Sequence, residues 1–285
     1  FSAYLFFMMW FMVFIYCPLA HMTWHPDGLF LKWGVVDFAG GIVVHASSGV
    51  AALAGAIFLG RRAAQTRQSQ PANIPFVLLG AAMLWLGWFG FNAGSSLHAD
   101  GQAVKAFLNT NTASATAMMT WIFFDCLRGR KPSAMGAAVG CVVGLVAITP
   151  SAGYVTVGQS IFIAFVITLI CNIAVYWRSH SRIDDALDVM GVHGIGGIWG
   201  CIAVGIFAVS GYSWVGDGGL IEGNLDMLVG QLVNVAVTLV YCFVVSFVIM
   251  KVIDWIMIKA TGRGARLSEE EQMIGSDIVE HGEPS

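Results

Sequence analysis

Long apolar stretches alternate with short polar segments along this chain, and the alternation predicts eight membrane-spanning helices. Most of the stretches hold about 20 residues, the length at which a helix crosses the hydrocarbon core of a bilayer. We place the spans at residues 1–20, 35–59, 74–95, 106–127, 134–149, 157–177, 189–210 and 228–253. The pattern therefore predicts an all-α, polytopic membrane domain over residues 1–260 and a polar tail over residues 261–285.

The composition agrees with a membrane protein and argues against a soluble one. Of the 285 residues, 57% are hydrophobic and 11% are charged, whereas soluble domains carry about 25% charged residues. The net charge of −3 gives no indication of a nucleic-acid partner, and we expect no metal site, cofactor or enzymatic activity. The cysteines stand singly in apolar stretches, so we interpret them as small packing residues: Cys17, Cys126, Cys141, Cys171, Cys201 and Cys242.

Basic residues gather in alternate connecting segments, which sets the expected orientation. The segments after the second, fourth, sixth and eighth spans carry Arg61, Arg62, Arg67, Arg128, Arg130, Lys131, Arg178, Arg182, Lys259, Arg263 and Arg266. The other connections hold only Lys32 and Lys105. Because cytoplasmic loops are enriched in Lys and Arg, we expect the basic side, with both chain ends, to be cytoplasmic.

The tail carries a helix-start signal. Ser268 is followed three residues later by Glu271, the spacing at which a serine and a glutamate cap each other's backbone amides. A short cytoplasmic segment of this kind is either partly helical or a disordered chain end.

Two of the predicted spans each contain one histidine in a glycine-rich setting. His45 lies eight residues after Asp37, and His193 lies five residues after Asp188, which is about 12 Å and about 7.5 Å further along a helix axis. The two spans run in opposite directions, so both imidazoles approach the middle of the bilayer. An ionisable residue at that depth is costly and usually functional. We expect the two rings to meet, as matched helices do in inverted-repeat transporters.

Two other interpretations of these histidines remain open. Each could form a hydrogen bond that only joins two helices. The pair could also ligate haem, although such sites typically use two histidines on each of two helices and here each span has one.

A second candidate site combines aromatic side chains with a hydroxyl group. Trp24 follows the first span, and Phe91 and Ser95 lie at the outer end of the third. An aromatic face together with a hydroxyl oxygen can hold a small cation by cation–π attraction and hydrogen bonding. The alternative is a belt of interfacial aromatic residues that only anchors the helices.

Five segments, taken in order, resemble the ammonium transporter (Amt/Rh) family, and in particular its bacterial Amt branch. They are His21-Met-Thr-Trp24, Asp37-Phe-Ala-Gly-Gly-Ile-Val-Val-His45, Gly87-Trp-Phe-Gly-Phe-Asn-Ala-Gly-Ser95, Thr149-Pro-Ser-Ala-Gly-Tyr154 and Asp188-Val-Met-Gly-Val-His193-Gly.

The resemblance implies a role for each matching residue. Trp24 and Ser95 match an external site that recruits ammonium, and Phe91 matches the inner of two gating phenyl rings. His45 and His193 match the twin histidines of a hydrophobic pore. The acids Asp37 and Asp188 match supports for these elements. The implied activity is transport of ammonium or ammonia.

The resemblance also implies an architecture and partners. The family fold is an inverted repeat of five plus five helices with an eleventh alongside, assembled as a homotrimer in the inner (plasma) membrane. Eight spans against eleven suggest that about three N-terminal helices are missing from this chain. The tail resembles a regulatory segment that binds a PII-type signal protein, although it reads Glu283-Pro-Ser where the family has a closing tyrosine.

Three other functions remain as alternatives: an ammonium sensor with the same fold, an Rh-type gas channel, and an intramembrane serine protease. Only His45-Ala-Ser-Ser-Gly faintly resembles a nucleophile motif.

Overall fold

The computed structural model describes residues 1–63, 71, 73–212 and 215–283, and over these residues it is helical without any strand. Arg67, one of the basic residues predicted to be cytoplasmic, lies outside this range, as do Pro284 and Ser285 at the end of the tail. The elements are α1 (Ser2–Phe11), η1 (Met12–Tyr16), α2 (Cys17–Trp24), α3 (Leu29–Lys32), η2 (Gly41–Ala46), α4 (Ser47–Leu59), α5 (Ile74–Gly94), α6 (Gly101–Leu127), α7 (Ala134–Ile148), α8 (Val157–His180), η4 (Met190–Gly194), α9 (Ile195–Phe207), η5 (Leu220–Glu222), α10 (Leu225–Thr261), α11 (Glu269–Ile274) and α12 (Ser276–His281).

Every predicted span contains a helix, although residues 35–40 of the second span are not helical, and the number of spans is only partly supported. Six helical stretches in the described chain are long and apolar enough to cross a membrane. The other two are α6, which is long but more polar, and α7, which is apolar but only 15 residues long. An all-α membrane protein is therefore confirmed, whereas the count of eight spans stays a prediction.

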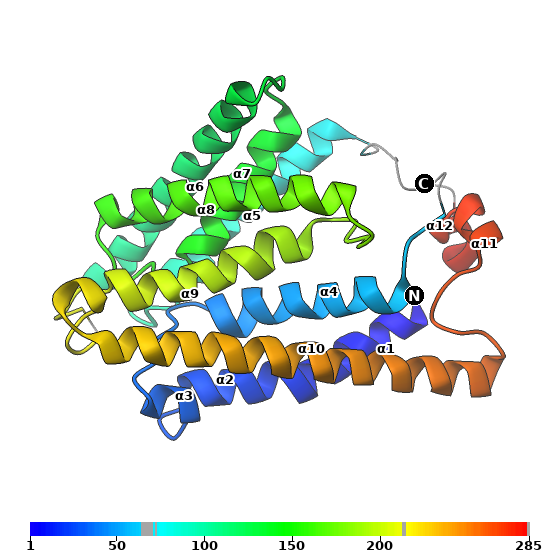
Figure 1. The fold of residues 1–285 in the computed structure, drawn as a ribbon, viewed down its shortest axis with the longest axis horizontal. Coiled ribbons are helices and arrows are strands. Elements are labelled where there is room, and N and C mark those ends of the chain that lie inside the picture. Colours follow the sequence, from blue (N-terminus) through cyan, green and yellow to red (C-terminus); the bar gives the residue numbers. More distant parts are fainter. Residues whose placement is uncertain (64–70, 72, 213–214, 284–285) are drawn as a thin grey trace.

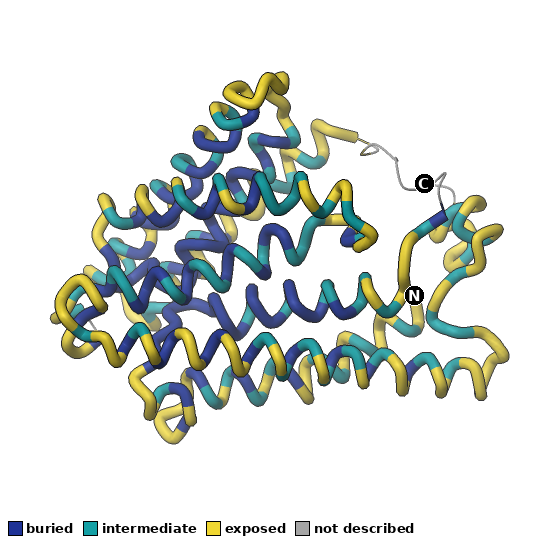
Figure 2. Tube along the Cα trace, viewed as in Figure 1, coloured by how far each residue is buried: buried dark blue, intermediate teal, exposed yellow. Residues whose placement is uncertain are grey.

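The long helices lie side by side around a buried centre (Figure 1). The longest, α10, packs against α4, α9 and α1, while α6 packs against α5, α7 and α8. Buried residues concentrate on α4, α7 and α9, and exposed residues on the outer helices and both ends of the bundle (Figure 2). The two histidines thus belong to the best-covered helices of the molecule.

Polar side chains mark where six of the helices begin. The residue before the first helical turn accepts a hydrogen bond from a backbone amide of that turn, which satisfies an amide the helix leaves unpaired. This holds for α5, α6, α7, α8, α10 and α11, with Asn73, Asp100, Ser133, Thr156, Asn224 and Ser268. The reciprocal cap predicted between Ser268 and Glu271 is confirmed.

The tail folds back onto the segment that follows α4. The guanidinium of Arg266 donates to the backbone oxygens of Leu59 and Arg61, and Gln272 accepts the amide of Ala63 at 2.8 Å. With α11 and α12 formed, the described part of the tail is partly helical, which favours the first of the two alternatives left open by the sequence.

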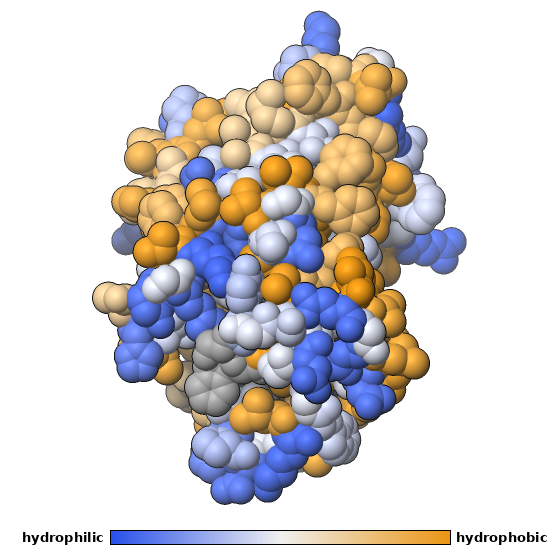
Figure 3. Space-filling model, turned by 90° about the vertical axis from the view of Figure 1, so that its left-hand side faces the viewer, coloured by the Kyte–Doolittle hydropathy of each residue, from blue (hydrophilic) through white to orange (hydrophobic). Residues whose placement is uncertain are grey.

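The opposite end of the bundle carries the α2–α3 and α9–α10 connections. Hydrophilic side chains gather across the middle and base of this face, and hydrophobic ones toward its top and right-hand edge (Figure 3). Trp24 and Trp33 are both exposed here, 40% and 47%, as expected for aromatic residues at a membrane interface.

Candidate functional site

His45 and His193 meet inside the bundle, which confirms the predicted contact. Their Nδ1 atoms are 3.3 Å apart, and the ring centroids are 5.4 Å apart with planes inclined by 29°. His45 is 3% exposed, whereas His193 is half-buried. The two rings are therefore joined by one hydrogen bond, and one of them remains accessible.

Glycines allow the two histidine-bearing helices to approach this closely. A Cβ on Gly49 would collide with the backbone of Gly194, and a Cβ on Gly197 would lie 2.6 Å from the oxygen of Gly41 and 2.9 Å from the Cβ of His45. Real side chains do not tolerate such distances to backbone atoms. Small residues are what permit membrane helices to pack backbone to backbone.

Asp37 holds the start of the turn that carries His45. Its Oδ1 accepts the amides of Gly40 and Gly41 at 3.0 and 2.7 Å, and its Oδ2 accepts the amide of Ile42 at 2.9 Å. Gly40 has a φ of +116°, a conformation that favours glycine. The carboxylate therefore pairs the amides that begin η2, in line with the supporting role expected for Asp37.

A different acid performs this task for His193. Asp185 accepts the amides of Val189 and Met190 at 3.1 and 2.8 Å. Asp188, the acid that the sequence analysis selected, instead pairs with Arg178 at 2.7 Å and has a φ of +55°. The sequence held a signal for the correct match, because Asp185 precedes His193 by eight residues, as Asp37 precedes His45.

Three further side chains surround the His45 ring. The hydroxyl of Thr149 lies 3.3 Å from His45 Nε2, and Trp88 stacks on the ring at 5.3 Å while its indole N–H donates to the same hydroxyl at 3.0 Å. The ring of Phe91 is 6.0 Å from that of His45. Phe91 thus lies next to the ring of His45, and its role as a gate stays a prediction, whereas Thr149 and Trp88 were not identified as site residues from the sequence.

The structure does not join Trp24 and Ser95. The indole N–H of Trp24 donates to the backbone oxygen of Asp37 at 2.7 Å, which places Trp24 at the turn before η2. The hydroxyl of Ser95 donates to the oxygen of Phe91 at 2.7 Å. Within the described residues no hydrogen bond links the two side chains, so their joint role in cation recruitment stays a prediction.

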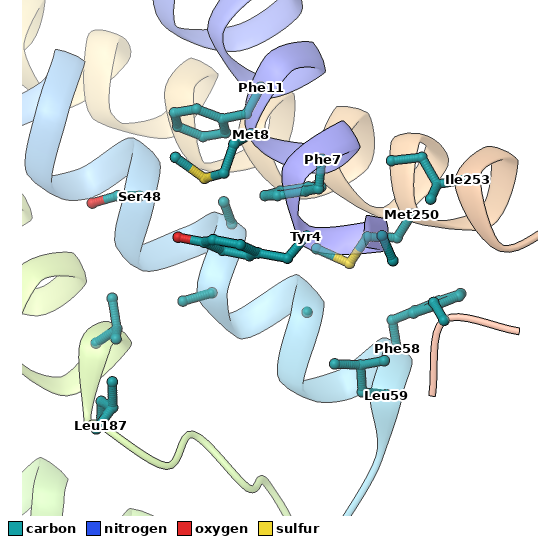
Figure 4. Close-up of a pocket in the computed structure, with 16 residues that line it drawn as sticks. Tyr4, Phe7, Met8, Phe11, Ser48, Phe58, Leu59, Leu187, Met250 and Ile253 are labelled. Atoms are coloured by element: carbon teal, nitrogen blue, oxygen red, sulfur yellow. The ribbon is translucent and has the colours of Figure 1, made fainter. Parts of the chain in front are cut away.

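An apolar pocket of about 510 Å³ lies beside α4 (Figure 4). It is lined by α1, α4, α10 and the segment before η4, with hydroxyl groups from Tyr4 and Ser48 and otherwise almost entirely apolar side chains. The hydroxyl of Ser48 donates to the backbone oxygen of His45 at 3.1 Å. The helix that continues the turn of His45 and the segment that leads into the turn of His193 therefore both line this pocket.

The described residues contain no cluster of three or more His, Cys, Asp or Glu side chains able to hold a metal ion. Four of the six cysteines are buried, as expected of packing residues, but Cys17 and Cys126 are exposed.

Comparison with known proteins identifies the group to which these features belong. A model of the Ammonium Transporter Family matches residues 1–285. The chain is 44% identical over 276 residues to the ammonium transporter Amt1 of Archaeoglobus fulgidus, covering 95% of this chain and 67% of that protein. It is 43% identical over 284 residues to the ammonium transporter of Bacillus subtilis, covering 99% and 68%.

Solved structures give the same result. Candida albicans Mep2 superposes with a TM-score of 0.86 at 35% identity, covering 97% of this chain and 62% of that one. A structure described as a sensor Amt protein superposes with a TM-score of 0.79 at 30% identity, covering 94% and 67%. The chain thus spans about two thirds of the length of these proteins. Matched by the family model from end to end, and carrying a hydrogen-bonded histidine pair between glycine-packed helices, the chain belongs to the ammonium transporter family.

Proposed function

We propose that the intact protein transports ammonium or ammonia across a membrane, and that His45 and His193 form the centre of its pathway. The observation that carries this proposal is the 3.3 Å contact between the two imidazoles inside a bundle of apolar helices. The relatives that the chain matches are named transporters. The only chemical step that we propose is a proton transfer that converts ammonium to ammonia.

The pair of imidazoles suits a substrate that donates hydrogen bonds. Ammonium and potassium have similar charge and size, but only ammonium has N–H donors and a proton to lose. An apolar surround penalises a bare cation and favours its neutral form. A neutral imidazole offers one donor and one acceptor, so the pair can receive the proton and then hydrogen-bond ammonia, while potassium is excluded.

Entry would take place at the end of the bundle where Trp24 and Ser95 lie. The exposed face of Trp24 supplies cation–π attraction, and the oxygen of Ser95 has lone pairs free for an N–H donor. Phe91 lies between Ser95 on its own helix and the His45 ring, with 38% of its surface exposed. Movement of this one ring would admit the substrate to the histidines.

Exit would take place through the apolar pocket beyond Ser48. Its apolar lining suits uncharged ammonia and not ammonium. The tail and the basic segments lie at this end, and we place them in the cytoplasm on the basis of their Lys and Arg content. The protein would then lie in the inner (plasma) membrane as a homotrimer, with the tail as a docking segment for a PII-type signal protein.

The pocket also bears on the length of the chain. Helix α1 has no buried residue, and the pocket opens beside it. We propose that the additional third of the relatives' length corresponds to helices that close this side. Residues 1–285 expressed alone should then fail to transport, and the full-length gene should succeed.

The decisive experiment is growth of a transport-deficient strain on low ammonium at acidic pH, where little free ammonia diffuses through the membrane. The full-length gene should restore growth, and His45→Leu or His193→Leu should abolish it. His98→Gln, which changes an exposed histidine, serves as the matched control. If full-length protein binds ammonium but never restores growth, the sensor alternative replaces this proposal.

A further inference from the structure

The hydrogen bonds around Thr149 determine where the protons of the two imidazoles lie. Thr149 follows the last residue of α7. Its own amide bonds to the oxygen of Val146 at 3.2 Å, and the next residue is Pro150, which has no N–H. The oxygen of Leu145 therefore lacks the usual backbone donors at a helix end, and it accepts the Thr149 hydroxyl at 2.8 Å.

Because the Thr149 hydroxyl donates its hydrogen to Leu145, its oxygen can only accept further hydrogen bonds. A hydroxyl has one hydrogen and two lone pairs, and the hydrogen is used by Leu145. One lone pair accepts the indole N–H of Trp88 at 3.0 Å, since indole nitrogen can only donate. The remaining lone pair faces His45 Nε2 at 3.3 Å. For this contact to be a hydrogen bond, Nε2 must carry a proton.

The proton position on His45 then fixes the proton position on His193. A neutral His45 that is protonated on Nε2 has a bare Nδ1. That Nδ1 faces His193 Nδ1 at 3.3 Å, so His193 must carry its proton on Nδ1 and have a bare Nε2. No described residue bonds to His193 Nε2, and His193 is the half-buried member of the pair. Among the four ring nitrogens, only His193 Nε2 therefore has a lone pair that no described residue uses, and it belongs to the more accessible histidine.

We propose that Thr149 is a positioning residue that sets this proton arrangement, and that His193 Nε2 is the atom that accepts the proton of ammonium. The proposal rests on the transport function proposed above. In the transfer one N–H bond of ammonium breaks, one N–H bond forms at His193 Nε2, the positive charge passes to the imidazole pair, and neutral ammonia remains. The reverse transfer, to an ammonia or water molecule, restores the pair.

The arrangement makes the two histidines unequal. His45 is held from one side by Thr149 and from the other by His193, and it is stacked under Trp88. Its role is to keep the proton on His193 Nδ1 by accepting a hydrogen bond from that N–H. In the reversed arrangement, His45 carries its proton on Nδ1 and its Nε2 is bare. Thr149 disfavours this arrangement because its oxygen would then face another lone pair, and removing the hydroxyl would remove that penalty.

The test is nitrogen NMR of ¹⁵N-histidine-labelled full-length protein in bilayers, because protonated and bare ring nitrogens resonate in separate ranges. Wild type should show His45 protonated on Nε2 and His193 on Nδ1. Thr149→Val should allow the reversed arrangement, raising its share by about five- to tenfold, the value of one neutral hydrogen bond. Thr149→Ser, which keeps the hydroxyl, should restore the wild-type spectrum.

Thr168→Val is the matched control. Thr168 is fully buried and bonds to the oxygen of Ala164 in the same way as Thr149 does to Leu145, at 2.6 Å, but no described hydrogen bond joins it to a histidine. Its spectrum should match wild type. A wild-type His45 protonated on Nδ1, or an unchanged spectrum in Thr149→Val, overturns the proposal. The NMR spectrum does not depend on transport activity. It therefore tests the proton arrangement separately, even if the proposed transport function fails its own test.

Discussion

Arg62 and Asp184 form a two-point ion pair that ties together the ends of the two histidine-bearing helices. Arg62 Nε and Nη2 donate to Asp184 Oδ2 and Oδ1 at 2.9 and 2.8 Å, and the Arg62 amide adds a third bond to Oδ2 at 2.8 Å. Arg62 follows α4, which continues the turn of His45, and Asp184 precedes η4, which carries His193. The pair therefore fixes both helices at one end of the bundle.

This ion pair predicts a loss of stability in acid. The hydrogen bond from Arg62 lowers the pKa of Asp184 to about 2, below the unfolded value of about 3.9. A carboxylate whose pKa is depressed on folding stabilises the folded state above its unfolded pKa, and this contribution disappears as pH falls toward its folded pKa. The stabilisation should therefore be present above about pH 4 and be lost between about pH 4 and about pH 2.

The measurement is the thermal midpoint of the purified full-length protein in detergent between pH 6 and pH 2.5. Asp184→Asn should lower the midpoint at pH 6, and its midpoint should fall less than that of wild type on acidification. Asp217→Asn, at an exposed position, should behave as wild type. Parallel pH curves for wild type and Asp184→Asn would contradict this account.

The second prediction separates the two acids near His193. Asp185→Asn removes one of the two acceptors of the η4 amides, which should cost about 1 kcal/mol and reduce transport. Asp188→Asn loses only the partly exposed contact with Arg178, and such ion pairs contribute about 0–1 kcal/mol. Asparagine also tolerates the positive φ at position 188.

Denaturant unfolding and methylammonium uptake, measured on both variants, give the comparison. A larger effect of Asp188→Asn than of Asp185→Asn would return the supporting role to Asp188.

The third prediction concerns the helix crossing. Gly49→Ala places a methyl group against the backbone of Gly194, which cannot move aside as a flexible side chain could. The two helices must separate, so the His45–His193 bond should lengthen and transport should be lost. Gly80→Ala is the control, because a Cβ at Gly80 meets nothing within 4 Å. Crystal structures or uptake assays that show Gly49→Ala equal to Gly80→Ala would exclude this packing argument.

The fourth prediction concerns substrate recruitment. Trp24→Leu combined with Ser95→Ala should leave expression intact and weaken discrimination of ammonium from potassium, because a cation–π face and a hydroxyl acceptor are each worth roughly 0.5–2 kcal/mol. Methylammonium uptake against competing potassium measures this. Trp33→Leu, also at an exposed tryptophan on this face, should have no effect. Unchanged affinity and selectivity in the double variant would remove Trp24 and Ser95 from the pathway.

Much of the fold could be predicted because apolar length is a strong signal. Each predicted span holds a helix, and the Ser268–Glu271 cap follows from spacing alone. The polar helix α6 extends five residues before the predicted span because Asp100 caps it at Gly101, outside the apolar stretch. Helix α10 likewise continues to Thr261, well past the predicted end at residue 253.

The site was less accessible from the sequence. The histidines could be paired because an isolated ionisable residue in an apolar span is conspicuous. Thr149 begins one of the five matching segments but was not singled out, since a threonine at a helix end usually bonds only to its own backbone, and its contact with His45 spans 104 residues. Asp185 was overlooked because Asp184, Asp185 and Asp188 crowd one short segment, and the spacing of eight residues that singles out Asp185 was not applied. The folded chain shows that its carboxylate accepts the amides of Val189 and Met190.

Both histidines lie in π-helical turns, η2 and η4. Such a turn contains one residue more than an α-helical turn, and one residue of an α-helix corresponds to a rotation of about 100°. The directions in which His45 and His193 point are therefore set by the number of residues in each turn as well as by their identities. Exchanging an apolar residue for another within 41–46 or 190–194 leaves the two rings facing each other. Deleting a single residue there would restore regular α-helix and turn the histidine away from its partner, so the apolar side chains of these two short windows should tolerate exchange for one another far better than any change in length.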